Sequence, residues 1–429
     1  MRPGGFNLSV EKLGDCRIAS PISGLPFVKE GEGVLFHRKL ADAENFLKAG
    51  KALPHFEMAG PREKIYFDPS KLKCGIVTCG GLCPGLNDVI RAIVMSLFYH
   101  YNVKSVFGFR FGFEGLVPSF GHTPIELNPG IVDDIHKWGG TILGTSRGPQ
   151  DVSEMADTLE RMNVRILFAI GGDGTLRGCS AIAEEIKKRE SKIGVIGVPK
   201  TIDNDISYVD QSFGFDTAVS ESRTAIYSAH TEALGIRNGV GLVKLMGRYS
   251  GFIAAYASLA NNDVNFCLVP EERFSLDVFL KALQQRLQAR GHAVIVVAEG
   301  AGQDLMGKYE KRDASGNLLL NDIGFFLKES IKGHFQRIHM EVNLKYIDPS
   351  YMIRSVPANA RDSAYCLLLG HNAVHAGMAG RTNMLVGLWN NRYTHVPIAL
   401  AAFERKKLDT ESRLWSDVLS CTGQPGKLI

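Results

Sequence analysis

Short apolar runs alternate along this chain with segments whose apolar residues recur every three or four positions. The runs have the length of strands that are buried on both faces, which is typical of parallel sheets. Helical spacing follows the first of them, at Val89, Ile93 and Leu97. The pattern predicts an α/β fold with mostly parallel sheets, whose strands cover residues 73–78, 103–108, 166–170, 193–198, 239–246, 266–269 and 293–298.

The chain has 429 residues, which is too long for one typical hydrophobic core and predicts two domains. Residues 1 to about 72 are rich in Gly and Pro and lack a regular period, apart from a short helix predicted over residues 41–47. We interpret this segment as an N-terminal extension that wraps a core. Near the other end of the chain, a helix is predicted over residues 364–369.

Composition argues against several classes of protein. Hydrophobic residues make up 45% and charged residues 22%, as in an ordinary globular protein. The formal net charge is +4, and no basic run is interleaved with aromatic residues, so we expect no nucleic-acid partner. No apolar stretch of about 18 residues could cross a membrane, and the N-terminus lacks the apolar segment of a signal peptide. The eight cysteines are scattered, which suits reduced thiols, so a cytoplasmic location is expected.

The apolar run at residues 166–170 breaks into Gly171-Gly172-Asp173-Gly174-Thr175, and a helical pattern follows at once. Glycines let the backbone come close to an anion, and the start of the next helix presents unpaired N–H groups and a positive dipole end. A carboxylate beside phosphates would repel them unless a cation lay between, so Asp173 predicts Mg2+ at this site. The alternative is an ordinary strand-to-helix turn with a solvated aspartate.

A second glycine loop, which contains Gly80 and Gly81, follows the strand at residues 73–78. It has no Lys-Ser/Thr pair, which excludes a Walker loop, and it lacks the Gly-x-Gly-x-x-Gly pattern of dinucleotide sites. Farther along, a polar loop ends in Arg147. Its guanidinium could clamp a phosphate, or it could cap a helix on the surface.

The strand at residues 193–198 leads into Lys200-Thr201-Ile202-Asp203-Asn204-Asp205. Two aspartates two positions apart in an extended loop point their carboxylates to the same side. This arrangement suits a general base with an electrostatic or metal-water partner. Thr201 adds a hydroxyl that could orient a reactant. An Asx-turn in a solvated loop is the alternative interpretation of Asp203 and Asp205.

Polar residues also follow the later predicted strands. Arg248, the pair Glu271 and Glu272, and Glu299 each come soon after one of them. Ligands of open α/β sheets gather at the carboxyl ends of the strands, so Arg248 and Glu299 are candidates by position as well as by type. Together with the two glycine loops and the aspartates, they predict phosphoryl transfer from a phosphoanhydride to a phosphorylated hydroxyl compound.

Taken in order, these loops resemble the 6-phosphofructokinase family, in its long-chain branch with an N-terminal extension. The resemblance covers most of residues 73–380 and rests on six segments, namely residues 75–91, 171–178, 199–205, 246–248, 298–300 and 345–380. It implies two Rossmann-like three-layer α/β domains in addition to the extension.

The resemblance also implies where each domain lies in the chain. The phosphate-donor (ATP) domain would cover residues 73–213 together with about 355–405. The fructose 6-phosphate domain would cover residues 214–354 together with the C-terminal segment.

The implied activity is that of an allosteric, glycolytic kinase. It would use Mg-ATP to phosphorylate fructose 6-phosphate at the 1-hydroxyl, giving fructose 1,6-bisphosphate. Asp203 would take the proton from that hydroxyl, with Asp205 and Thr201 helping to position it and the Mg2+ shell. Asp173 would bind the Mg2+ that bridges the donor's phosphates. The residues implied to meet the donor are Gly80, Gly81, Arg147, Gly172, Asp173, Gly174 and Thr175.

The residues that match the family's sugar side are Met246, Gly247, Arg248, Glu299, Lys345, Tyr351 and Arg354. The first three resemble the family's sugar-binding and charge-stabilising loop. Glu299 would hold sugar hydroxyls, and Arg354 would bind the 6-phosphate. Lys345 and Tyr351 stand where the family often has Arg and His for the same phosphate, so a cation and a hydrogen-bond donor are preserved.

In this family the residue after Gly-Gly-Asp correlates with the phosphoryl donor. Gly174 leaves room for the α-phosphate of a nucleotide, whereas Asp at this position goes with pyrophosphate. Lys200 is shared with pyrophosphate enzymes and could neutralise a phosphate or leaving group, but a flexible lysine can move aside. We therefore expect ATP as the donor, and pyrophosphate-dependent transfer to the same sugar is the alternative.

The family's subunits form a homotetramer, and a homodimer is the alternative assembly. Their sites are completed across an interface by a cation a few residues before the Met-Gly-Arg loop. Gly239 stands at the aligned position here, and Arg237 is close by. The sequence identifies neither the allosteric effectors nor the role of residues 1–72.

Two more distant functions compete with this interpretation. A lipid or nicotinamide-dinucleotide kinase also contains Gly-Gly-Asp-Gly-Thr, but Asp203, Arg248 and Arg354 would then have no clear purpose. A non-enzymatic, sugar-phosphate-binding regulatory subunit would be expected to lack Asp203 or Asp173, and both are present.

Overall fold

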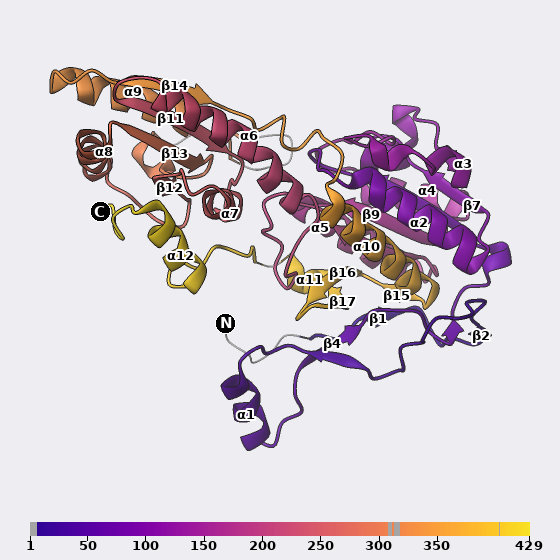
Figure 1. Ribbon diagram of the computed structural model, residues 1–429. Coiled ribbons are helices and arrows are strands. Elements are labelled where there is room, and N and C mark those ends of the chain that lie inside the picture. Colours follow the sequence, from indigo (N-terminus) through magenta and orange to yellow (C-terminus); the bar gives the residue numbers. More distant parts are fainter. Residues whose placement is uncertain (1–6, 308–310, 313–317, 403) are drawn as a thin grey trace. The chain divides into compact units, whose positions relative to one another are not determined.

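The computed structural model describes residues 7–307, 311–312, 318–402 and 404–429 (Figure 1). Contacts between residues divide the chain into two compact units. Unit 1 comprises Met1–Thr201, Ile206–Gly214 and Val356–Arg405, and unit 2 comprises Ile202–Asp205, Phe215–Ser355 and Lys406–Ile429. Residues 202–205, which include the Asp-Asn-Asp loop, therefore belong to unit 2, although the residues directly before and after them belong to unit 1.

Unit 1 is built on a nine-stranded sheet with the order β3-β4-β17-β16-β10-β9-β6-β7-β8. Its central strands run parallel and are β16 (Met384–Trp389), β10 (Gly194–Pro199), β9 (Ile166–Gly171), β6 (Lys73–Thr78) and β7 (Ser105–Gly108). The strands toward the edges are antiparallel to their neighbours and are β17 (Arg392–Pro397), β4 (His55–Met58), β3 (Gly33–Leu35) and β8 (Ile125–Leu127). All residues of β9 and β10 are buried, which explains their continuous apolar runs.

Helices cover both faces of this sheet because alternate residues of its strands point to opposite sides. Ile166 of β9 lies against Gly377 of α10, whereas Leu167 shares a core with Leu176 of α5. The helices of unit 1 that follow the extension are α2 (Leu86–Tyr101), α3 (Pro129–Val132), α4 (Val152–Arg161), α5 (Asp173–Lys188), α10 (Ala360–Met378) and α11 (Ile398–Ala401).

Unit 2 has a four-stranded, wholly parallel sheet with the order β12-β13-β11-β14. The strands are β11 (Gly239–Leu245), β12 (Phe266–Leu268), β13 (His292–Ala298) and β14 (Asn343–Ile347). Gly241 lies against Ala229 of α6 on one face, and Ile295 shares a core with Leu283 of α8 on the other. The helices of this unit are α6 (Phe215–Leu234), α7 (Phe252–Ala260), α8 (Leu276–Arg290), α9 (Ile323–Arg337) and α12 (Arg413–Thr422).

The N-terminal extension adds strands to unit 1. Its β4 pairs with β17, so β3 and β4 extend the large sheet, while β1 (Glu11–Lys12) pairs with β15 (Arg381–Thr382). A separate ladder joins β2 (Ile18–Ala19) to β5 (Lys64–Ile65). The predicted short helix is α1 (Leu40–Lys48).

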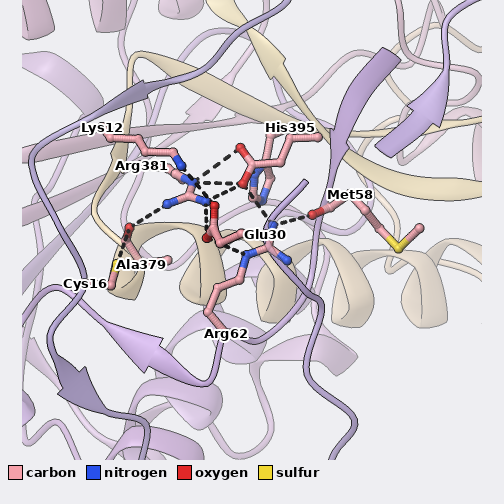
Figure 2. A network of polar contacts seen from close by, with 9 residues as sticks. Lys12, Cys16, Glu30, Met58, Arg62, Ala379, Arg381 and His395 are labelled. Atoms are coloured by element: carbon pink, nitrogen blue, oxygen red, sulfur yellow. Dashed lines mark hydrogen bonds and ion pairs between the residues drawn. The ribbon is translucent and has the colours of Figure 1, made fainter. Parts of the chain in front are cut away.

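A network of charged side chains, in which Arg381 and Arg62 are buried, joins the extension to the large sheet (Figure 2). Glu57 of β4 accepts hydrogen bonds from Arg381 of β15 and from Arg62, which is 2.9 Å away. The exposed fraction is 1% for Arg381 and 4% for Arg62. Glu30 pairs with Arg381 at 3.1 Å and with Lys12 at 3.0 Å. Burial alone would raise the pKa of Glu57, but bonds and charges from His395 and Arg381 outweigh it and hold that pKa far below its usual range.

The predicted fold class is confirmed, and the differences concern element ends and sheet edges. Helix α2 continues to Tyr101, so β7 starts two residues later than predicted, and α10 is longer at both ends than the predicted helix. The antiparallel hairpin of β16 and β17 was not predicted. Among the helices of the described residues, none is long and apolar enough to cross a membrane.

Candidate active site

In the glycine turn that joins β9 to α5, the backbone of Gly171 lies very close to the side chain of Thr175. A Cβ atom at Gly171 would lie 2.1 Å from Thr175 Oγ1, so only glycine fits there. Gly172 is the N-cap of α5, and Asp173 occupies its first turn. The N–H of Lys200 donates to the carbonyl oxygen of Gly171 at 3.0 Å, which joins this turn to the end of β10. The free N–H groups at the start of such a helix suit a phosphate.

Asp173 is ion-paired within unit 1. Arg405 Nε donates to Asp173 Oδ2 at 2.6 Å, and the two side chains are 29% and 12% exposed. Arg405 is held in place because it forms an antiparallel bridge with Ile206. The carboxylate predicted to bind Mg2+ therefore has a guanidinium beside it, which sequence reasoning missed.

The second glycine loop lies against the loop that precedes Arg147. Gly80 has a φ of 85°, a left-handed value that favours glycine, and its N–H donates to Ser146 at 3.0 Å. Thr145 Oγ1 donates to the carbonyl oxygen of Gly80 at 2.6 Å. Lys200 Nζ donates to the carbonyl oxygen of Gly81 at 2.5 Å. The structure thus brings the two glycine loops and Lys200 together.

Lys200 and Arg147 differ in exposure. The Lys200 side chain is 6% exposed, whereas Arg147 is exposed. An added Cβ at Gly174 would make only an ordinary van der Waals contact, because the nearest neighbouring atom is Arg177 Nη2 at 3.9 Å. Thr201 follows Lys200, and its carbonyl oxygen accepts a bond of 2.6 Å from Ser212 Oγ.

In unit 2, Asp203 and Asp205 are held through their backbone. Ser250 Oγ donates to the carbonyl oxygen of Asp203 at 2.9 Å. The N–H of Lys406 donates to the carbonyl oxygen of Asp205 at 2.8 Å. Asn204 between them has a φ of 54°, which places it in the left-handed region.

The carboxyl group of Asp203 lies in an environment that disfavours its charge. Burial, then the nearby charges of Asp205 and Glu299, raise the pKa of Asp203 well above its usual range, and Arg248 opposes this. The pKa of Glu299 is also raised, by burial, against the opposing charge of Arg248. Asp203 therefore does not have the environment of a solvated aspartate in an exposed loop.

Arg248 and Glu299 come together because the ends of β11 and β13 pack backbone to backbone. The N–H of Gly300 donates to the carbonyl oxygen of Gly247 at 3.1 Å. A Cβ at Gly300 would lie 2.0 Å from the carbonyl oxygen of Arg248, so glycine is required for this approach. Met246 and Gly247 begin the loop that carries Arg248. Ligands are expected at this carboxyl edge of the sheet.

Arg354 follows β14 and adds a cation with an unused donor. Its guanidinium carbon lies 4.8 Å from the ring centroid of Tyr351. Arg354 Nε is buried and, within the described residues, has no hydrogen-bond partner. An orphaned donor of this kind suits an anion. Tyr351 itself is 74% exposed.

Lys345 does not join this group within one chain. It pairs in register with Gly241, four residues before the end of β11, and its Nζ lies 4.0 Å from Glu232 of α6. Arg237 is near the same end of the sheet, because its carbonyl oxygen accepts from Asn343 Nδ2 at 3.2 Å. These two cations thus lie toward the amino end of β11, and Arg248 lies beyond its carboxyl end.

The residues around Asp173 fit a Mg2+ that arrives with a nucleotide. In the described part of the chain, no group of three or more His, Cys, Asp or Glu side chains could hold a metal ion by itself. Kinase Mg2+ is usually held by one or two carboxylates together with substrate phosphates. A single carboxylate at a helix start matches that donor set, and the metal would have to share Asp173 with Arg405 or displace it.

Known proteins resemble this chain over most of its length. The phosphofructokinase family model matches residues 73–377. The chain is 49% identical to the ATP-dependent 6-phosphofructokinase of Borreliella burgdorferi, over 98% of this chain and 97% of that protein. It is 51% identical to ATP-dependent 6-phosphofructokinase 7 of Arabidopsis thaliana, over 89% of this chain and 79% of that protein.

Solved structures support the fold alone. The pyrophosphate-dependent phosphofructokinase of Marinobacter aquaeolei matches with a TM-score of 0.68 at 18% identity, over 82% of this chain and 92% of that one. The phosphofructokinase of Pichia pastoris matches with a TM-score of 0.63 at 20% identity, over 82% of this chain and 37% of that one. By its family match and its relatives, this chain belongs to the phosphofructokinase family, in the ATP-dependent branch.

Proposed function

We propose that this protein transfers the terminal phosphoryl group of ATP to the 1-hydroxyl of fructose 6-phosphate. The product is fructose 1,6-bisphosphate, and the step belongs to glycolysis. The observation that carries the proposal is the near-full-length similarity to ATP-dependent 6-phosphofructokinases, in a chain that retains Asp203 beside Arg248 and Glu299.

Asp203 is proposed to accept the proton of the attacking hydroxyl. A raised pKa makes the Asp203 carboxylate a stronger proton acceptor than an ordinary aspartate, which suits this role. Arg248 lies close enough to affect that pKa, and it would stabilise negative charge on the transferred group. Asp205 and Thr201 would help to position Asp203 and the 1-hydroxyl of the sugar.

The sugar is proposed to bind along the carboxyl edge of the sheet of unit 2. Glu299 would accept hydrogen bonds from sugar hydroxyls, with Met246 and Gly247 supplying the adjoining surface. Arg354, with its buried and unused Nε, would bind the 6-phosphate, and Tyr351 would donate from the rim.

The donor is proposed to bind at the glycine loops of unit 1. Gly80 and Gly81 would approach its phosphates, together with Gly172, Gly174 and Thr175 at the start of α5. The exposed Arg147 would steady the phosphoryl group being transferred. Mg2+, held by Asp173, would neutralise the charge of the donor's phosphates. The absence of a side chain at Gly174, whose nearest neighbouring atom would lie 3.9 Å from an added Cβ, supports a nucleotide as donor.

A homotetramer is the assembly we propose, with a cytoplasmic location. Lys345 and Arg237 lie away from Arg248 within one chain, so a second copy could present them to a neighbouring site. A homodimer, which also supplies a second copy of the chain, is the alternative assembly.

One observation favours pyrophosphate as a competing donor. Lys200 is buried, and its ammonium lies on the glycine loop that would meet the donor. Purified protein should therefore be assayed with fructose 6-phosphate, Mg2+ and either ATP or pyrophosphate, side by side. Turnover with ATP alone supports our proposal. Turnover with pyrophosphate alone would show that ATP is not the donor. No turnover with either donor would overturn the proposed function.

A further inference from the structure

Glu271, just beyond the end of β12, holds two segments that lie far apart in the sequence. Both of its carboxylate oxygens accept from the N–H of Gly251, each at 3.0 Å. Oε1 also accepts from the N–H of Leu408 at 2.8 Å. A single carboxylate therefore fastens the start of α7 and the returning C-terminal segment within unit 2.

The first of these segments is hydrogen-bonded to the backbone of Asp203. Ser250 precedes Gly251, is fully buried, and donates from Oγ to the carbonyl oxygen of Asp203 at 2.9 Å. The chain at Gly251 is packed so closely that an added Cβ would lie 2.4 Å from Val269. Ser250 consequently has little freedom to follow any movement of Asp203.

The second segment is hydrogen-bonded to Asn204 and Asp205, which follow Asp203 in the chain. Lys406, two residues before Leu408, donates from its N–H to the carbonyl oxygen of Asp205 at 2.8 Å. Its Nζ donates to Asn204 Oδ1 at 3.0 Å. Residues 203–205, which we call the base loop, are therefore held on both sides by segments that share Glu271 as their anchor.

An ordinary helix cap would account for the bonds between Glu271 and Gly251. It would not account for the third bond, to Leu408, which ties a separate segment to the same carboxylate. Glu271 is also partly buried, and removing its charge would leave the two N–H groups it serves with a single, uncharged amide oxygen as acceptor.

We propose that Glu271 is a positioning residue for the general base Asp203, acting through Ser250 on one side of the base loop and Lys406 on the other. The inference rests on the proposed function, because it presupposes that Asp203 takes the substrate's proton. A displacement of about 1 Å at a reacting group can cost about 10²-fold in rate, so a loosened base loop should reduce turnover more than binding.

The test compares Glu271→Gln with Glu272→Gln, the adjacent carboxylate in the same turn. We expect Glu271→Gln to lower kcat by about 10-fold to 10²-fold, with each KM within about threefold of the wild type. Without substrate, hydrogen exchange at the amides of residues 203–207 should be faster in Glu271→Gln alone. Unchanged kcat and exchange, or a raised KM with normal kcat, would overturn the proposal.

Ser250→Ala keeps the proposal testable if Glu271→Gln does not fold, because it removes a single buried oxygen. Its matched control is Ser258→Ala on α7, whose Oγ is equally buried but donates to Ala254 of its own helix at 2.8 Å. Ser250→Ala should lower kcat by about tenfold and Ser258→Ala should not. Equal effects of the two variants would contradict the proposal.

Combining Glu271→Gln with Ser250→Ala tests whether the two residues act along one route. The fold reduction of kcat in the double variant should be smaller than the product of the reductions in the two single variants. A reduction equal to that product would contradict a shared route. Failure of the proposed function would look different. Wild-type protein would not phosphorylate fructose 6-phosphate, while the exchange measurement would still report whether Glu271 orders the base loop.

Discussion

Gly174 lies in the first turn of α5, where the proposed donor would place its phosphates. Replacing Gly174 with Asp should leave folding intact, because the nearest described atom to an added Cβ is 3.9 Å away. The new carboxylate would repel and obstruct the phosphates of ATP. We expect kcat/KM for ATP to fall by about tenfold or more, equivalent to about 1.4 kcal/mol, with the Tm unchanged.

Gly174→Ala is the matched control for that substitution. It adds a small, uncharged group at the same position and should retain most of the activity with ATP. A Gly174→Asp variant that used ATP as well as the wild type would show that this position does not govern access of the nucleotide.

The sequence pattern singles out individual residues of the candidate site, whose roles stay predictions. Asp173, Asp203, Arg248 and Glu299 are candidates because each follows an apolar strand at the edge where ligands gather. Arg405 could not be found in this way, because it stands in a basic run without a motif and meets Asp173 only through the fold.

Among the helices, α2 and α10 pack against each other around histidines, of which His375 is buried and His100 and His371 are partly buried. The ring centroids of His100 and His371 are 5.1 Å apart, and His375 Nδ1 is 2.9 Å from the hydroxyl of Tyr101. Burial, then the charges of neighbouring histidines, lower the pKa of His371 to about 4 and that of His375 to about 3. Both side chains are therefore neutral in the folded chain near neutral pH.

Because of the histidines in this helix pair, the free energy of unfolding should decrease as the pH is lowered. An unfolded histidine takes up a proton near pH 6.5, so unfolding binds protons below that pH and stability falls from there toward about pH 4. We expect the Tm to drop between pH 7 and pH 5, and to drop less in His371→Gln, which cannot be protonated. Equal losses of Tm in the two proteins would show that His371 does not contribute.

Elements were predicted well where burial imposes a continuous apolar run, as in β9 and β10. The hairpin of β16 and β17 was missed although Asn390 and Asn391 both have positive φ, which is typical of a two-residue hairpin turn. The strands of the extension span two to four residues each, which is too short for a period to be recognised.

At the scale of the molecule, the extension depends on the charged network of Figure 2. Replacing Glu57 with Gln would leave Arg381 and Arg62 buried without their shared carboxylate. Breaking one side of a buried ion pair costs about 3–5 kcal/mol, so we expect a lower Tm. Limited proteolysis should also cut residues 7–72 more readily.

Glu63→Gln serves as the control for that change. Glu63 is exposed and belongs to the same extension, so its substitution should leave the Tm and the digestion pattern as in the wild type. If Glu57→Gln behaved like Glu63→Gln, the network would not be what holds the extension.

The order of strands in each sheet lies beyond what the sequence pattern could predict. The pattern predicts that parallel strands exist, but which strands become neighbours depends on the packing of the whole chain. The placement of Lys345 is an example, because only its pairing with Gly241 shows that it lies away from the end of β11.

Asp203 is proposed to accept the proton of the sugar hydroxyl, and the Asp203→Ser variant removes the carboxylate that this role requires. The variant should fold and bind fructose 6-phosphate nearly as the wild type does, which a ligand-induced shift in Tm would measure. Its turnover with Mg-ATP should fall by about 10² or more, because general-base assistance is lost. Near-normal turnover in a variant that still binds the sugar would contradict the account.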